Sequence, residues 1–180
     1  MAGVTSPREG PKQPALYTIG HSNHSLTRFL ELLSGAGIAA IADVRSQPVS
    51  RFAPQFNKDA LIRALEAGGI AYAYMGRELG GRPKDAGLLT GGKPDYEKMA
   101  RADAFRDGLA RLAAESATHR LAILCAERDP TDCHRFLLVA RALAAQGIEV
   151  AHILANGDIE TQEDTERRMR ALKPQADLFG

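Results

Sequence analysis

The chain has 180 residues, a net charge of +1 at pH 7, and 44% hydrophobic and 25% charged residues. These values favour one domain with a full hydrophobic core and exclude a protein-wide charge that attracts nucleic acid or membranes. No run approaches the roughly 18 apolar residues of a membrane-spanning helix. With two cysteines and no apolar export segment near the start, a cytoplasmic location and free thiols are expected.

The expected elements follow a regular order along the chain. Residues 1–14 are expected to be a disordered lead-in, residues 15–173 a single α/β domain, and residues 174–180 a tail. Apolar runs predict strands at 15–19, 38–44, 70–75, 120–126 and 149–154. Capping residues and apolar periodicity predict helices at 25–35, 57–67, 96–100, 104–115, 132–146 and 161–172. The glycine-rich stretch 76–94 is expected to be a long functional or mobile loop.

Strands that alternate with helices predict a three-layer sandwich with a mostly parallel sheet of about five strands. The strands are nearly continuous apolar runs, as expected when helices cover both faces. Right-handed crossovers bring the carboxyl ends of parallel strands to one edge of the sheet, where ligands of open α/β sheets bind. The segments expected to share that edge are 20–24, 43–48, 76–82, 125–129 and 156–158.

The run 121–135 is the densest motif, because a buried strand opens there into a polar loop and then a helix. It contains both cysteines, Cys125 and Cys133. Cys133 lies near the start of the helix, where the positive end of the helix dipole lowers the pKa of a thiol. It is therefore either a nucleophile or ligand, or a half-buried packing residue; Cys125 is either part of a site or a small hydrophobe. The spacing excludes a phosphatase loop, a thioredoxin motif and a four-cysteine zinc site.

Candidate site residues are chosen for their chemistry at the shared edge. Catalytic roles are predicted for His21, Asp43, Glu127 and Cys133. Substrate binding is predicted for Ser22, Arg45, Gly81, Arg82, Cys125, His134 and Arg135. Asp43 and Arg45 are expected to face the same side of a strand. They form either a structural ion pair, or a general base, Asp43, beside an anion-binding group, Arg45. Arg135 either holds a phosphate or pairs with Glu127.

Five motifs in a fixed order resemble one known family. They are Thr18–Ser22, Asp43–Arg45 with Pro48 and Ser50, Leu79–Gly81, Cys125–Glu127 and Cys133–Arg135. Over residues 16–155 the chain resembles the domain of unknown function 488 family of bacteria and archaea. The resemblance implies the α/β fold and a site at the strand ends, and it brings no established activity.

The preferred functional prediction is an enzyme that acts on a small anionic or nucleotide-like substrate. One alternative is a non-catalytic nucleotide- or nucleic-acid-binding module that uses an exposed patch of Arg51 and Phe52. A second alternative is a metal-dependent enzyme, in which both cysteines, one histidine and a carboxylate bind zinc or iron. The spacing matches no dedicated metal motif, so no metal ligand, cofactor or oligomeric state is assigned, and no membrane partner is expected.

Overall fold

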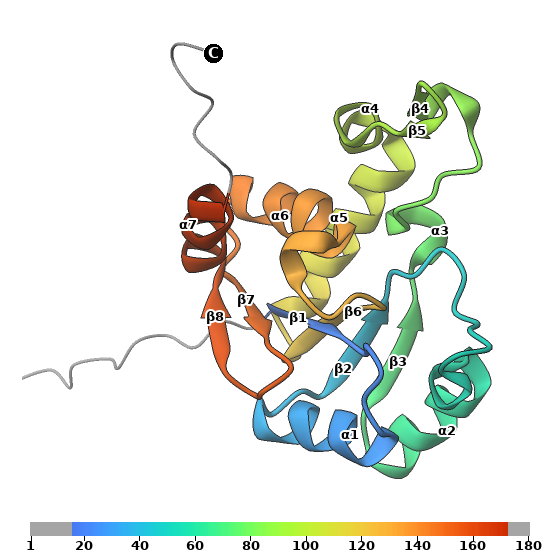
Figure 1. Cartoon of the computed structure of the whole chain (residues 1–180), viewed down its shortest axis with the longest axis vertical. Helices are drawn as coiled ribbons and strands as arrows, with labels where there is room; N and C mark the ends of the chain where they lie inside the picture. Colours follow the sequence, from blue (N-terminus) through green and yellow to red (C-terminus); the bar gives the residue numbers. More distant parts are fainter. Residues whose placement is uncertain (1–15, 173–180) are drawn as a thin grey trace, which may run out of the picture.

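A computed structural model describes residues 16–172, which form a six-stranded sheet in the order β3-β2-β6-β1-β7-β8 (Figure 1). The strands are β1 (Leu16–Gly20), β2 (Ala40–Asp43), β3 (Ala71–Tyr74), β6 (Leu121–Cys125), β7 (Val150–Ile153) and β8 (Ile159–Thr161). All pairs are parallel except β7 with β8. The predicted α/β fold with a mostly parallel sheet is confirmed. The predicted lead-in and tail lie outside the described residues.

Helices cover both faces of the sheet (Figure 1). One face carries α1 (Leu26–Gly35), the short 3-10 turn η1 (Pro54–Phe56) and α2 (Lys58–Ala67). The other carries α5 (Asp103–Ser116), the π-helix η4 (Arg135–Ala140), α6 (Arg141–Ala145) and α7 (Gln162–Leu172). Each layer buries its own hydrophobic cluster against the sheet. Within residues 16–172, no helix combines the length and apolar character needed to cross a bilayer.

Local signals explain most of these elements. Ser25 caps α1 by accepting a hydrogen bond from the backbone amide of Arg28 at 3.1 Å. Gly37 follows that helix with a φ of +64°, which glycine adopts without steric cost. Along β6, Ala122 and Leu124 face the α1 side, and the alternate residues face the α5 side. The apolar run that predicted this strand therefore reflects burial on both faces.

The prediction of a long loop at residues 76–94 is wrong. The segment contains α3 (Gly76–Leu79), the 3-10 turn η2 (Ala86–Leu88), and a hairpin of β4 (Leu89–Thr90) and β5 (Lys93–Pro94), and α4 (Tyr96–Arg101) follows it. Two of the glycines that suggested a loop, Gly91 and Gly92, make the hairpin turn, and both have positive φ. The helix predicted at 132–146 is also more complex, because it begins with the 3-10 turn η3 (Pro130–Asp132) and continues as η4 before α6.

The strands β1 and β6 lie side by side, and their connections leave toward opposite faces. Gly20 at the end of β1 is in register with Cys125 at the end of β6. From there the chain enters α1 on one face and η4 on the other (Figure 1). Adjacent strands whose connections diverge create the crevice in which open α/β sheets bind ligands. A Cβ at Gly20 would overlap the carbonyl oxygen of Glu127, so glycine lets the two loops run this close together.

Candidate functional site

Four side chains meet where β6 ends, and we call them the thiol cluster: Cys125, Glu127, Cys133 and His134. The thiol of Cys125 donates to Glu127 Oε2 at 3.1 Å and lies 3.6 Å from Nδ1 of His134. The Sγ of Cys133 lies 3.8 Å from the same nitrogen. Both cysteines and His134 are buried, whereas Glu127 is largely exposed. Residues far apart in the β6–η4 connection therefore form one reactive group.

The two thiols differ strongly in acidity. Burial acts to raise the pKa of Cys133, but hydrogen bonds with Cys125 and His134 and the positive charge of Arg135 outweigh it and lower the pKa to about 5. The hydrogen bond with Cys133, together with burial, raises the pKa of Cys125. Burial also opposes ionisation of Glu127, but hydrogen bonds from both thiols lower its pKa overall. Cys133 is therefore the more acidic of the two thiols.

The imidazole of His134 is fixed from two sides. Its Nε2 lies 3.2 Å from the carbonyl oxygen of Val44, just past the end of β2. On another side is Gly81, where a Cβ would come within 2.6 Å of His134 Cγ. Because a backbone carbonyl only accepts, Nε2 carries a proton in this contact, and Nδ1 is the nitrogen that faces the two sulfur atoms. Gly81 and His134, both predicted site residues, are thus neighbours in space.

Arg135 is fully buried, and its contacts differ from those expected. Its guanidinium donates to the backbone carbonyls of Glu127 and Arg128, at 2.7 and 3.2 Å, rather than to the Glu127 carboxylate. Its backbone amide lies 3.4 Å from the Cys133 sulfur. Among the described residues, its Nε has no hydrogen-bond partner. Arg135 therefore holds the loop after β6 and adds positive charge beside Cys133.

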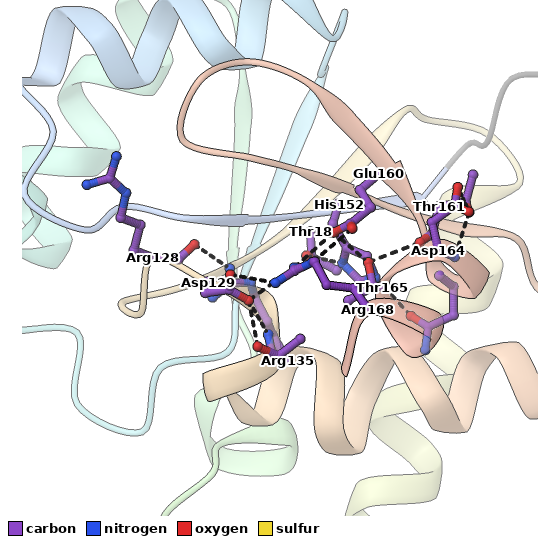
Figure 2. Close-up of polar contacts among 12 residues, drawn as sticks. Thr18, Arg128, Asp129, Arg135, His152, Glu160, Thr161, Asp164, Thr165 and Arg168 are labelled. Atoms are coloured by element: carbon purple, nitrogen blue, oxygen red, sulfur yellow. Dashed lines mark hydrogen bonds and ion pairs between the residues drawn. The ribbon is translucent and has the colours of Figure 1, made fainter. Parts of the chain in front are cut away.

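A polar network anchors the far side of this loop. Figure 2 shows Arg168, from α7, between Asp129 of the loop and Glu160 of β8, with hydrogen bonds of 2.9 and 3.0 Å. Thr165 donates to the same Glu160 at 2.9 Å. The side chain of Arg128 extends away from this network (Figure 2). The network thus fixes the loop and leaves Arg128 directed elsewhere.

A second group lies on the α2 side of the edge. Asp43 and Arg45 form a buried ion pair, with Arg45 donating to both carboxylate oxygens at 2.9 and 2.6 Å. Tyr72 donates to Asp43 at 2.8 Å, and burial, followed by the charge of Asp43, raises the pKa of this phenol. Arg45 also donates to the carbonyl of Phe56 at 2.8 Å. The guanidinium of Arg45 thus holds Asp43 and a neighbouring turn.

His21 lies between the two groups. Its ring stacks on Phe56 with centroids 4.5 Å apart, and its Nδ1 lies 2.8 Å from the carbonyl oxygen of Ser22. Burial lowers the pKa of His21 below its usual value. Ser22 has a φ of +47°, which costs a residue other than glycine about 1 kcal/mol or more. This strained residue lies at the start of the crevice.

The free positive charges at this edge are exposed. Arg82 and Arg128 lie on the loops after α3 and β6, and within residues 16–172 neither guanidinium forms an ion pair. The backbone amide of Arg82 donates to Ser46 Oγ at 2.9 Å, which fixes the position of its loop. Phe52 is 84% exposed beneath the guanidinium of Arg51, whereas Phe56 is a core residue.

Sequence reasoning missed three contributors to the site. The sequence predicts only a strand at Tyr72, yet the pairing of that strand with β2 brings the phenol to Asp43. For Tyr96 of α4 the sequence predicts only a helix. Its phenol lies close enough to the thiol cluster that, besides burial, the charges of both cysteines raise its pKa. Val44 contributes its backbone carbonyl, which contacts His134 Nε2. Every residue has such a carbonyl, so the residue type gives no sign of this role. Only Tyr72 could have been found from the sequence, because the alternation of side chains along paired strands places it on the same face as Asp43.

Comparison with known proteins identifies the family but no activity. The family model described as "Domain of unknown function DUF488" matches residues 25–142. This match covers more than half of the 180 residues, so the chain belongs to that family. No curated protein and no solved structure matches. Any function must therefore be argued from the site.

Proposed function

We propose that this member of the DUF488 family is an enzyme that acts on a small anionic or nucleotide-like substrate in the crevice between β1 and β6. The supporting observation is that the thiol cluster and His21 lie on the two sides of one topological switch point. A purely structural role would not need two thiols, two imidazoles and two carboxylates at one sheet edge.

The groups divide into distinct roles. Cys133, beside His134 and Arg135, supplies a thiolate at the base of the crevice. Glu127 has an exposed carboxylate next to it and is suited to transfer protons to and from solvent. His21, on the opposite side, faces the charges of Asp43 and Glu127. Asp43 itself acts through its field, because its oxygens are occupied by Arg45 and Tyr72.

The substrate's negative charge is met by the exposed arginines. Arg45 and Arg135 are already engaged with protein groups, so they position the site. In the part of the chain that the structure describes, the guanidiniums of Arg82 and Arg128 form no ion pair, and each residue directly follows a neighbour or a member of the thiol cluster in the chain, Gly81 and Glu127 respectively. Arginine binds carboxylate and phosphate in a bidentate manner, which suits an anionic substrate.

The test is a binding and turnover screen with matched variants. A panel of small phosphates, carboxylates and nucleotides is measured by thermal shift on the wild type, Arg82→Ala, Arg128→Ala and a control, Arg101→Ala. Arg101 is an exposed arginine of α4, and its partner among the described residues is Glu97. Binding is expected to weaken in the first two variants, by roughly tenfold or more for a charge-assisted contact, and not in the control.

Compounds that bind are then incubated with the wild type and with Cys133→Ser, and product formation is followed by mass spectrometry. We expect turnover by the wild type and little by the variant. A panel without a single binder, or equal turnover by both proteins, contradicts the proposal.

A further inference from the structure

We propose that Cys125, Cys133 and His134 bind one zinc ion, with the Glu127 carboxylate or a water molecule as the fourth ligand. This inference deepens the proposed function by naming a cofactor for the same crevice, with the Cys133 thiolate as one of its ligands rather than as a free nucleophile. Only the catalytic use of the metal rests on that function; the binding itself rests on the geometry of the thiol cluster.

The first argument is distance. Both Sγ atoms and His134 Nδ1 lie within 4.8 Å of one another. In tetrahedral zinc sites, bonds of about 2.3 Å to sulfur and 2.0–2.1 Å to nitrogen place a sulfur and a nitrogen ligand about 3.6 Å apart. The two sulfur–nitrogen distances here are 3.6 and 3.8 Å. Both sulfur–nitrogen distances therefore match the ligand spacing of a tetrahedral zinc site.

The second argument is the orientation of the imidazole. Metal-binding histidines usually donate their other ring N–H to a carbonyl or carboxylate, which fixes the tautomer and the ring plane. His134 has this arrangement, because Nε2 lies against the Val44 carbonyl and Nδ1 faces both sulfurs. Gly81 leaves the space that the ring occupies. His21, another histidine of this edge, lies outside the thiol cluster, with its Nδ1 at the backbone carbonyl of Ser22.

The third argument is charge. Two thiolates and the Glu127 carboxylate carry three negative charges, and Zn²⁺ with the buried guanidinium of Arg135 carries three positive ones. Within residues 16–172, the side-chain hydrogen bonds of Arg135 go to carbonyls and none goes to a carboxylate. A buried cation without a carboxylate partner is costly unless an anionic group lies nearby. A zinc-bound thiolate cluster meets that need while keeping the site neutral.

The ligand set also indicates a catalytic rather than a closed structural site. Three protein ligands, two thiolates and one imidazole, leave a fourth position for water or substrate. The only candidate for that position in the cluster, Glu127, is also its only exposed member. A zinc ion at this place lowers the pKa of bound water or polarises a substrate oxygen.

Metal analysis of the full chain tests the inference. The protein is purified without a polyhistidine tag or chelator, with its thiols kept reduced, and its zinc content is measured by mass spectrometry. Zinc is then removed, and Co²⁺ is titrated to detect the thiolate-to-cobalt charge-transfer band. The variants are Cys125→Ser, Cys133→Ser and His134→Gln. The control is His24→Gln, since His24 lies at the same edge outside the cluster.

We expect roughly one zinc per chain. In each ligand variant, zinc affinity should fall by more than about 100-fold, which exceeds the loss typical when a residue that only contacts a metal ligand is replaced. The control should bind zinc as the wild type does. If a ligand variant does not fold, the cobalt spectrum of the wild type decides alone: no charge-transfer band overturns the inference. Zinc binding that survives both cysteine substitutions also overturns it.

The two proposals fail separately. Zinc binding with no bound or converted compound in the panel supports the zinc site and contradicts the enzyme. Turnover by a protein that has no affinity for zinc or cobalt supports the enzyme and overturns the zinc site.

Discussion

The stability of the protein is expected to fall between pH 6.5 and pH 4 because of one buried histidine. His152 of β7 is fully buried, and its Nδ1 lies 2.8 Å from the Thr18 hydroxyl. Its Nε2 lies 2.9 Å from Gln162 Oε1, and the amide nitrogen of Gln162 donates to Glu166. In this orientation the amide oxygen of Gln162 accepts a hydrogen bond from Nε2–H. The Thr18 hydroxyl can then donate to Nδ1, so the neutral ring with its proton on Nε2 satisfies both contacts.

The size of the effect follows from the pKa. Burial, aided by the charge of Arg135, lowers the pKa of His152 from 6.5 to about 4. Above pH 6.5 the ring is neutral in both the folded and the unfolded chain. Between pH 6.5 and 4 the unfolded chain takes up a proton that the folded protein does not, so the free energy of unfolding decreases. Lowering the pKa from 6.5 to about 4 corresponds to about 3 kcal/mol, most of which is lost by pH 4.

The assay is urea unfolding followed by circular dichroism at several pH values from 7 to 4, on the wild type and His152→Gln. Protonation of carboxylates with lowered pKa, such as Glu160, also decreases the free energy of unfolding in acid, but this happens in both proteins. The glutamine of the variant is polar but does not ionise in this pH range. The stability difference between the two proteins should therefore shift by about 3 kcal/mol in favour of the variant as pH falls. A difference that stays constant with pH refutes the reasoning.

Two further predictions concern the site. In Gly81→Ala, the new Cβ displaces the imidazole of His134, so zinc affinity measured by competition with a chelator should fall roughly tenfold or more. Gly35→Ala meets open space and has no positive φ, so this control should bind zinc normally and gain up to about 1 kcal/mol of stability. Asp43→Asn leaves Arg45 buried without its carboxylate, and urea unfolding at pH 7 should show a loss of about 3 to 5 kcal/mol. A loss below 1 kcal/mol, which is typical of exposed pairs, would contradict that burial argument.

The sequence by itself determined the elements whose signals are local. The apolar run of β6 and the Ser25 cap of α1 act over a few residues, so pattern and capping identified them. The alternation of strands and helices also predicted the parallel sheet and the edge at which the candidate site lies. The strand β8 was missed, because its antiparallel pairing with β7 depends on the turn before it and on a neighbouring strand.

Tertiary structure decided which candidate residues meet. Cys125 and His134 come together because η4 folds back over the end of β6, and Asp43 lies on the opposite side of the sheet with Arg45 and Tyr72. Arg135 donates hydrogen bonds to carbonyls of a loop that is held from the other side by Arg168 of α7. Residue type fixes what a side chain is able to donate or accept. Its partners depend on long-range packing, which local sequence does not encode.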